Sequence, residues 1–453
     1  MTPAREPLIQ IEPPDAAFEN HPIAAGLAAP ADSAADRMAC EGAAAALFKK
    51  VNGARRIAVR LLDEGLKLIF GRGNPRRAIA YRTVRHVLVF EPGSLGDITM
   101  LLPFLQSLRK GLPRARISLV CRSATGRQRK SYASISRSSI ETLVLRQGLA
   151  DELIPVPIPW LRADPNGRRP RYNLFSRDWL AFVTSLYRLR RRRFDLAFAG
   201  GRTDIRYNFA LWLTGAARRV GYGYAGGARL LTEVVTPDMS RPHQSELALH
   251  LLEHLSIPSV RNEKVLTVSP ADRKKALHFL WDHGIKPGDF AVGIHPGSRV
   301  PARTWGEHGF REVARQLIQN FGVKVIWFVE PVDQTSPPSD PNVVPAALPL
   351  PEFLAVLSAC NFLVCNDSGP MHMSGALGVP VVAIFGSTFP EWFRPPGPLH
   401  RVVTRRDVPC RPCGDRCLYD EPYCLRLIPV EQVMTEVRAM MDSLQFQRRA
   451  QGS

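Results

Sequence analysis

The chain has 453 residues, of which 45% are hydrophobic and 22% are charged. One hydrophobic core seldom serves so long a chain, so we expect two domains with additional segments. Eight cysteines spread over this length exclude a small secreted domain stapled by disulfides. No run approaches the roughly 20 apolar residues that cross a bilayer, and residues 1–20 lack the basic and apolar parts of a signal peptide. The expected location is therefore the cytoplasm.

The 60 Lys and Arg residues, against 41 Asp and Glu, give a formal net charge of +19. Such an excess favours an anionic partner, which is a nucleic acid, an acidic membrane surface or a phosphorylated substrate. The sequence contains no helix-turn-helix, RNA-recognition or zinc-finger pattern, so we expect no nucleic-acid partner. Arginine runs such as residues 190–193 are also typical of a solvated helix end.

Residues 1–80 form an extension ahead of the expected domains. Roughly the first 40 residues are rich in Ala, Pro and acidic residues without a sustained period, a composition typical of a flexible leader. Residues 43–70 carry apolar side chains at helical spacing with Lys and Arg between them, which predicts a basic amphipathic helix. Two interpretations stay open: the helix lies on an anionic membrane, or it docks on the body of the protein.

From residue 86 onward, short β-rich runs alternate with helical patterns. This alternation is typical of a parallel sheet with helices on both faces. Two doubly wound domains in series, joined between Val260 and Lys286, would place a ligand crevice at the carboxyl ends of both sheets. The first cycle has strands expected at residues 86–90, 116–121, 195–199 and 219–221 and a helix at 98–110. The second has strands expected at 290–295, 323–329, 362–365 and 381–385 and helices at 307–320, 350–359, 370–377 and 430–444.

A glycine-bearing turn, Gly93-Ser-Leu-Gly-Asp97, follows the first strand and opens a helix. The carboxylate of Asp97 has two interpretations. As an N-cap it would accept the free amide hydrogens of the first helical turn, which is worth about 1 kcal/mol. As a general base it would stand on a constrained loop within reach of an acceptor hydroxyl. The turn alone does not decide between them.

Two turns of the second half are placed to hold an anion. Cys365-Asn-Asp-Ser-Gly-Pro-Met-His372 follows a strand and opens a helix, so backbone amides of Ser368 and Gly369 can point at a diphosphate. The turn His295-Pro-Gly-Ser298 follows a neighbouring strand, and Arg303 beyond it can neutralise phosphate charge. Each turn is a weak signal by itself, because glycine turns follow strands in many α/β proteins.

Taken together, the motifs resemble the heptosyltransferase-like glycosyltransferases of family 9, which build the inner core of bacterial lipopolysaccharide. The order and spacing of the motifs carry the resemblance, which extends from about His86 to Met440. The matching segments are Gly93-Ser-Leu-Gly-Asp97, Phe194-Asp-Leu196, Arg202-Thr-Asp-Ile-Arg206, Arg219-Val-Gly-Tyr-Gly223, His295-Pro-Gly-Ser298, Asn366-Asp-Ser-Gly-Pro-Met-His372 and Gly378-Val-Pro-Val-Val382.

The resemblance implies an α/β fold of the GT-B type, with two Rossmann-like domains facing across a cleft behind an N-terminal extension. Residues 81–269 would form the acceptor-binding domain, and residues 270–453 the nucleotide-sugar-binding domain with its closing helix. It also implies inverting transfer from a nucleotide-diphosphate sugar, typically ADP-heptose, without a metal or other cofactor.

The resemblance assigns site residues on both sides of the cleft. Asp97 would be the single base of an inverting displacement, on an acceptor-side loop with Gly93, Ser94 and Gly96. The donor-binding residues would be Asp367 on the sugar hydroxyls, the amides of Ser368 and Gly369 on the diphosphate, His372 close by, Ser298 in the neighbouring turn, and Arg303.

The chain departs from the family pattern in two places. The phosphate-clamping loop reads Arg303-Thr304-Trp305 where Lys-Arg-Trp is usual, which changes a point charge into a planar guanidinium. The segment expected to bind the ribose reads Phe328-Val-Glu-Pro-Val-Asp333, so either Glu330 or Asp333 would serve.

Four cysteines crowd together late in the chain, at Cys410, Cys413, Cys417 and Cys424. Their spacing would suit zinc, and a cytosolic setting disfavours simple disulfides. Structural thiols without a metal are the other interpretation, in line with the cofactor-free activity that the resemblance implies.

The expected function is transfer of a heptose, or a related sugar, to a lipid-linked anionic acceptor of the lipopolysaccharide type. The enzyme would act peripherally at the inner face of the cytoplasmic membrane, where its basic charge is attracted to anionic lipid. Two alternatives stay open: an enzyme of the same fold with another sugar or glycan, such as a capsule, and a non-catalytic protein that binds an anionic ligand.

Overall fold

A computed structural model gives the structure of the chain. It describes residue 65 and residues 83–451, apart from gaps at 124–135, 162–176, 201–203, 224–225, 239, 263, 331–334, 415–416 and 418. The expected leader and nearly all of the expected basic helix lie outside the described residues. Asp333 and the start of the Arg202 motif also lie outside them.

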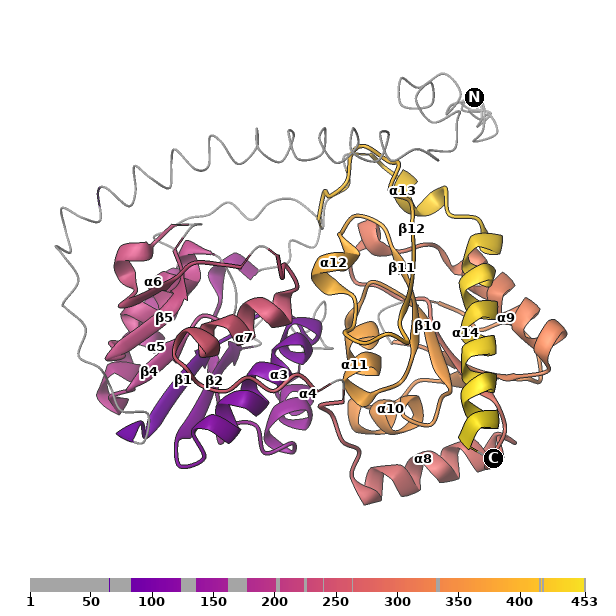
Figure 1. Cartoon of the computed structure of the whole chain (residues 1–453), viewed down its shortest axis with the longest axis horizontal. Coiled ribbons are helices and arrows are strands. Elements are labelled where there is room, and N and C mark those ends of the chain that lie inside the picture. Colours follow the sequence, from indigo (N-terminus) through magenta and orange to yellow (C-terminus); the bar gives the residue numbers. More distant parts are fainter. Residues whose placement is uncertain are drawn as a thin grey trace, which may run out of the picture.

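The first half of the chain forms a six-stranded parallel sheet, shown in indigo to pink in Figure 1. Its spatial order is β3-β2-β1-β4-β5-β6, the order of a dinucleotide-binding fold. We call this sheet with its helices the first lobe. The strands are β1 (His86–Phe90), β2 (Arg116–Arg122), β3 (Glu152–Val156), β4 (Leu196–Phe198), β5 (Arg218–Tyr222) and β6 (Glu233–Val235).

The second half repeats the same topology in a second parallel sheet. Its spatial order, β12-β11-β10-β7-β8-β9, is that of the first sheet when its strands are counted from β7. This sheet with its helices is the second lobe. The strands are β7 (Ala291–His295), β8 (Lys324–Phe328), β9 (Val343–Ala346), β10 (Phe362–Asn366), β11 (Val381–Phe385) and β12 (Arg401–Thr404).

Helices cover both faces of each sheet. In the first lobe they are α3 (Leu95–Gly111), α4 (Arg137–Ile140) with a π-helical turn (Glu141–Leu145), α5 (Arg177–Arg188), α6 (Ile205–Leu213) and α7 (Gln244–His254). In the second they are α8 (Pro270–Asp282), α9 (Glu307–Phe321), α10 (Leu350–Leu357), α11 (Gly369–Leu377), α12 (Pro390–Phe393), α13 (Tyr423–Arg426) and α14 (Val430–Gln451).

The alternation of side chains along β1 explains why the strand is apolar from Val87 to Phe90. Val87 and Val89 face the layer of α3 and α7, whereas Leu88 and Phe90 face the layer of α5 and α6. Both faces are buried, so an unbroken apolar run is needed. The helix that follows begins at Leu95, three residues before the predicted start at residue 98, because Ser94 caps its amino end.

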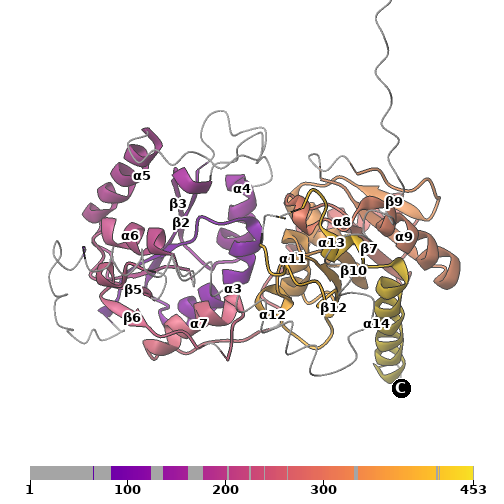
Figure 2. The ribbon, with the colours of Figure 1, turned by 90° about the horizontal axis from the view of Figure 1, so that it is seen from above.

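The two lobes pack directly against each other. One hydrophobic cluster runs from the α3 and α7 side of the first sheet through α11 and α10 to the facing side of the second sheet. Figure 2 shows the two lobes side by side, with α3 next to α11, and the two helices are in contact. The carboxyl ends of β1 and β10, which precede these helices, are thereby brought to one junction.

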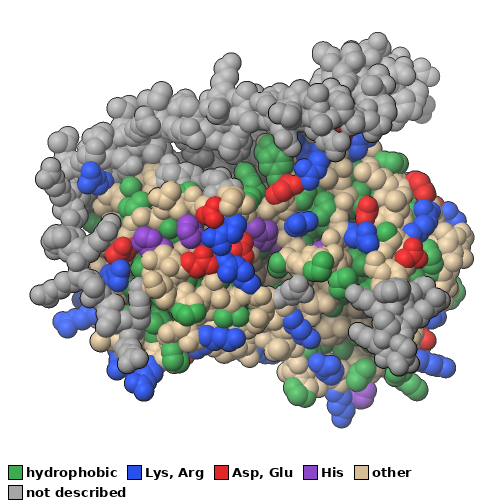
Figure 3. All heavy atoms as spheres, viewed as in Figure 1, with side chains coloured by type: hydrophobic (Ala, Val, Ile, Leu, Met, Phe, Trp, Pro, Cys, Tyr) green, Lys and Arg blue, Asp and Glu red, His purple; other side chains and the backbone are tan. Residues whose placement is uncertain are grey.

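Among the described residues, no helix has the length and apolar character that crossing a membrane requires. On the face shown in Figure 3, the described Lys and Arg side chains are interspersed with acidic ones.

Candidate active site

The turn after β1 positions Asp97 by a reciprocal capping arrangement at the start of α3. The Ser94 hydroxyl accepts a hydrogen bond from the Asp97 amide at 3.4 Å. In return, Oδ2 of Asp97 accepts from the Ser94 amide at 2.6 Å and from the Ser94 hydroxyl at 2.9 Å. The carboxylate is therefore a helix cap, and its orientation is fixed by the start of the helix.

The predicted loop residues Gly93 and Gly96 have little room for a side chain. A Cβ on Gly93 would lie 2.5 Å from Oδ2 of Asp97 and 2.6 Å from Oε1 of Glu91. A Cβ on Gly96 would lie 3.0 Å from Cδ2 of His372, which belongs to the other lobe. The structure thus brings Gly93, Ser94 and Gly96 together around Asp97 and sets Gly96 against the second lobe.

A second carboxylate, Glu91, stands beside Asp97. It is only 1% exposed, and its Oε1 accepts hydrogen bonds from the Gly93 amide at 2.9 Å and the Tyr207 hydroxyl at 3.4 Å. The sequence analysis did not identify Glu91. A charged residue directly after a buried strand, ahead of a glycine turn, is the signal that would have found it.

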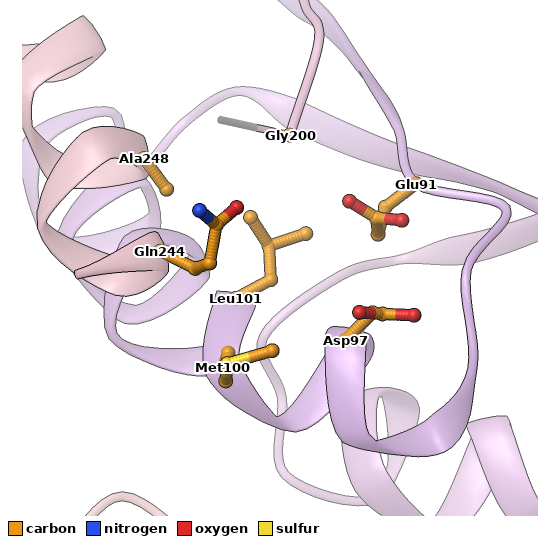
Figure 4. Close-up of a pocket in the computed structure, with 7 residues that line it drawn as sticks. All are labelled: Glu91, Asp97, Met100, Leu101, Gly200, Gln244 and Ala248. Carbon is orange, nitrogen blue, oxygen red and sulfur yellow. The ribbon is translucent and has the colours of Figure 1, made fainter. Parts of the chain in front are cut away.

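Both carboxylates line a hollow at the carboxyl ends of the first sheet, shown in Figure 4. The hollow lies at the carboxyl ends of the neighbouring strands β1 and β4. The strand order reverses between these two strands, and folds of this kind bind ligands at that point. Its lining residues are Glu91, Asp97, Met100, Leu101, Gly200, Gln244 and Ala248.

On the second lobe, Asp367 directly follows β10 and is fully enclosed. The side chain is 0% exposed, the Thr388 hydroxyl donates to its Oδ2 at 2.5 Å, and Nη1 of Arg303 lies 3.3 Å from the same oxygen. Arg303 therefore pairs with a carboxylate in this structure, and its planar guanidinium suits the two oxygens of such a group or of a phosphate.

The amino end of α11 follows Asp367 directly. Ser368 is the N-cap residue, its side chain makes no capping bond, and its hydroxyl donates instead to the Asn366 carbonyl at 3.2 Å. The Ser368 side chain thus leaves the first amides of α11 uncapped. A helix amino end with such amides is a site for an anion.

Asn366 ties the two predicted donor turns together. Its side chain donates to the Pro296 carbonyl at 2.7 Å and accepts from the Trp305 amide at 3.0 Å. Ser298 lies in the first of these turns, where its hydroxyl donates to the Val300 carbonyl at 3.3 Å. The turn after β7 and the segment Arg303-Thr304-Trp305 are thereby held beside the start of α11.

His372 lies in the first turn of α11 and is 8% exposed. Burial lowers the pKa of His372 to about 3, against a smaller opposing effect of the Asp97 carboxylate. The imidazole is therefore neutral at physiological pH. A neutral imidazole brings no positive charge to the start of α11.

Glu330 follows β8 and contacts His295 at the end of β7, with 3.7 Å between Oε1 and Nε2. The neighbouring His295 ring holds the pKa of Glu330 below its usual range, against the effect of burial. Of the two residues proposed for the ribose, Glu330 is thus placed beside the donor turns. Asp333 lies outside the described residues.

The cysteine-bearing loop after β12 contacts the segment that carries Thr388, the hydrogen-bond partner of Asp367. Arg411, which is 5% exposed, donates to the Thr388 carbonyl at 2.7 Å and to the Thr404 hydroxyl at 2.7 Å. The amide of Cys413 donates to the Ser387 carbonyl at 3.1 Å. The cysteine-bearing loop thus holds the segment whose Thr388 hydroxyl bonds to Asp367.

The four clustered cysteines are free thiols. Burial raises the pKa of Cys413 to about 11 and that of Cys424 to about 12, so these thiols are protonated at neutral pH. Within the part of the chain that the structure describes, no group of three or more potential ligands is arranged to hold a metal ion.

Comparison with known proteins bears directly on this arrangement. The model of glycosyltransferase family 9 (heptosyltransferase) matches residues 187–423, just over half of the chain. The chain belongs to glycosyltransferase family 9. The matched residues include all those predicted to bind the donor, from Ser298 to His372, and begin beyond Asp97.

Relatives of the chain in the family are heptosyltransferases by name. Lipopolysaccharide heptosyltransferase 2 of Salmonella typhimurium is 33% identical over 128 residues, which is 25% of this chain and 35% of that protein. Lipopolysaccharide core heptosyltransferase OpsX of Haemophilus influenzae is 22% identical over 241 residues, or 50% of this chain and 67% of that protein. The match thus spans about a third of the Salmonella relative.

Solved structures of family 9 proteins share the fold. A Veillonella parvula glycosyltransferase of the family superposes with a TM-score of 0.58 at 22% identity, over 81% of this chain and all of that one. The E. coli ADP-heptose lipopolysaccharide heptosyltransferase II superposes with a TM-score of 0.55 at 20% identity, over 80% of this chain and 99% of that one. The expected GT-B architecture of two Rossmann-like units is therefore confirmed.

Proposed function

We propose that this family 9 glycosyltransferase moves a heptose from ADP-heptose to a lipid-linked acceptor of the lipopolysaccharide core, with inversion at the anomeric carbon. The observation that carries the proposal is the approach of the two lobes. Gly96, next to Asp97, lies against His372, so the Asp97 carboxylate and the anion-binding start of α11 meet across one junction. The choice of heptose as the transferred sugar rests on the names of the heptosyltransferases given above.

The proposed reaction uses groups from both lobes. Asp97 takes the proton of an acceptor hydroxyl as its oxygen attacks the anomeric carbon. The bond between that carbon and the diphosphate oxygen breaks, and its electron pair leaves with ADP. The α11 amides and Arg303 stabilise the negative charge that develops on the diphosphate. Asp367 binds sugar hydroxyls, and Glu330 binds the ribose.

In this mechanism the leaving group is stabilised by protein groups, so we propose that the transfer needs no metal or other cofactor. The residues that would replace a metal are Arg303 and the amides of Ser368 and Gly369. Transfer measured after exhaustive chelation should equal transfer with added Mg²⁺, and a requirement for the metal would contradict this part of the proposal.

We further propose that residues 81–269 bind the acceptor and residues 270–453 the donor, in the cytoplasm and peripherally at the inner membrane face. A net charge of +19 supports attraction to anionic lipid. Flotation with vesicles of anionic lipid should carry the full chain upward at low salt, whereas neutral vesicles should leave it behind.

The donor assignment is tested by assaying sugar transfer and hydrolysis across ADP-heptose and UDP-, GDP- and CMP-sugars. The proposal expects turnover with ADP-heptose at least about tenfold faster than with the other donors, because a nucleotide pocket discriminates by its paired polar groups. Preference for another nucleotide sugar would contradict ADP-heptose as the donor but not the glycosyltransferase activity. No turnover of any donor would contradict the activity itself.

A further inference from the structure

The hollow of the first lobe presents two polar side chains that the proposed transfer leaves without a role. They are the carboxylate of Glu91 and the amide of Gln244. Glu91 follows β1 directly and Gln244 is the first residue of α7, so regular elements fix both. In Figure 4 both side chains extend toward the space that the Asp97 carboxylate also borders, above an apolar wall formed by Met100 and Leu101.

Glu91 is held in one orientation. The Gly93 amide at 2.9 Å and the Tyr207 hydroxyl at 3.4 Å both donate to its Oε1. Gly200 leaves room on the other side, since a Cβ there would lie 2.7 Å from Oε2 of Glu91. A buried carboxylate that donors such as these keep in place between two glycines is preorganised to accept hydrogen bonds from a ligand.

Gln244 is half-buried, and its side-chain amide makes no hydrogen bond with any residue that the structure describes. An amide offers two N–H donors and one carbonyl acceptor, and these groups are ordinarily paired when they are shielded from water. Its position at the edge of the hollow, opposite Glu91, leaves it facing whatever enters.

The chemistry of this set selects hydroxyl groups. A carboxylate accepts from a hydroxyl, and an amide both donates to and accepts from one, so neighbouring hydroxyls of a sugar satisfy Glu91 and Gln244 together. A carboxylate or phosphate on the same sugar has no proton to give Glu91 and is repelled by it. The set is therefore suited to a polyol without a negative charge.

We propose that Glu91 and Gln244 bind the hydroxyls next to the one that Asp97 deprotonates, and so select an acceptor whose terminal sugar is a neutral polyol. This inference rests on the proposed glycosyl transfer and adds its acceptor specificity. The negative groups of the acceptor then lie farther along the glycan, outside the hollow.

The test compares two lipid A-linked acceptors that differ only in the terminal sugar, which is either a neutral heptose or an ulosonic acid with a carboxylate. With ADP-heptose, the wild-type protein should use the neutral acceptor with a kcat/KM at least about tenfold higher. Glu91→Gln keeps an acceptor oxygen but loses the charge, and should reduce this preference about fivefold or more. Gln244→Ala should raise the acceptor KM about tenfold with the donor KM unchanged.

The matched control is Glu246→Gln, on the same helix but in surface ion pairs with Arg241 and Arg261, which should alter neither the preference nor the acceptor KM. Equal use of the two acceptors by the wild-type protein overturns the inference. The inference is also overturned if Glu91→Gln prefers the neutral acceptor as strongly as the wild type does, or if Gln244→Ala leaves the acceptor KM unchanged.

A binding measurement separates this inference from the proposed function. Ligand-observed NMR with methyl α-heptoside, in the presence of ADP, should show binding that Gln244→Ala weakens. If this binding is found but neither acceptor receives a sugar, the transfer proposal fails and the polyol site stands. If transfer occurs but the heptoside binds Gln244→Ala as well as the wild type, the polyol site fails alone.

Discussion

Asp97 caps α3 and lines the hollow with the same carboxylate. The sequence predicted two roles for this carboxylate, an N-cap and a general base, because a turn pattern does not tell which way a capping side chain faces. In the structure they are compatible, since the bonds from Ser94 also fix the orientation that a base would need. Glu91 escaped prediction for a related reason: its importance comes from Gly200 and Tyr207, which lie more than 100 residues away along the chain.

The buried His372 makes a prediction about stability and pH. In the unfolded chain its pKa is 6.5, and in the folded protein it is about 3. Above pH 6.5 neither state binds a proton at this residue, so it has no effect there. Below pH 6.5 this residue is protonated only in the unfolded chain. The free energy of unfolding therefore falls by up to about 1.4 kcal/mol for each unit by which the pH decreases, until the folded pKa is reached.

Replacing His372 by Asn should remove this contribution to the slope. Urea unfolding of His372→Asn and of the wild type at pH 7.5, 6.0 and 5.0 measures it. The matched control is His308→Asn, an exposed histidine of α9, which should keep the wild-type slope. Identical slopes for His372→Asn and the wild type would mean that the imidazole is not buried as a neutral ring.

Among the helices and strands, prediction succeeded for the interior of both sheets and failed at their edges. All eight interior strands are confirmed to within two residues at either end, because burial on two faces demands an apolar run that is visible in the sequence. The four edge strands were missed. They are β3, β6, β9 and β12, short strands that carry Glu152, Pro155, Glu233, Pro345 and Arg401.

The loop after β11 makes a prediction about donor binding. Thr388→Val keeps the volume of the side chain but removes the hydroxyl that donates to Oδ2 of Asp367. A hydrogen bond to a charged group is worth about 1.5–3 kcal/mol, so kcat/KM for the donor should fall by about 10- to 100-fold. Thr388→Ser retains the hydroxyl and should retain most of the activity. Initial rates at varied ADP-heptose measure both variants.

An equal loss in Thr388→Ser and Thr388→Val would assign the effect to packing and not to the hydrogen bond. An unchanged acceptor KM in both variants is expected as well, because Asp367 and Arg411, to which Thr388 is hydrogen-bonded, belong to the second lobe. This loop could not be predicted as part of the site, since its link to the cysteine segment runs through Arg411 and appears only in the folded chain.

For the molecule as a whole, sequence patterns predicted two parallel sheets but not the way in which they meet. Helical periodicity shows that a helix has a buried face, whereas it does not show which other helix covers that face. The hydrophobic cluster that joins the two lobes through α3 and α11 is therefore information that only the structure supplies.

The junction makes a prediction of its own. Gly96→Ala would set a Cβ 3.0 Å from Cδ2 of His372, so α3 and α11 must move apart by a few tenths of an ångström. Overpacking of this kind costs about 1 kcal/mol or more. We expect kcat to fall while the Kd for ADP, which calorimetry measures, stays within about twofold, because the α11 amides are untouched. A fall in ADP affinity with kcat unchanged would contradict this.

The most direct test of the central claim is the rate of heptose transfer by Asp97→Asn beside a matched capping variant. Asp272 on α8 accepts a hydrogen bond from the hydroxyl of the N-cap residue Ser269, whose oxygen accepts in turn from the Asp272 amide, so Asp272→Asn controls for the loss of this part of the cap. We predict that Asp97→Asn lowers kcat by about 10²- to 10⁴-fold with ADP binding retained, while Asp272→Asn keeps wild-type activity. An Asp97→Asn enzyme as active as Asp272→Asn would show that Asp97 only caps the helix.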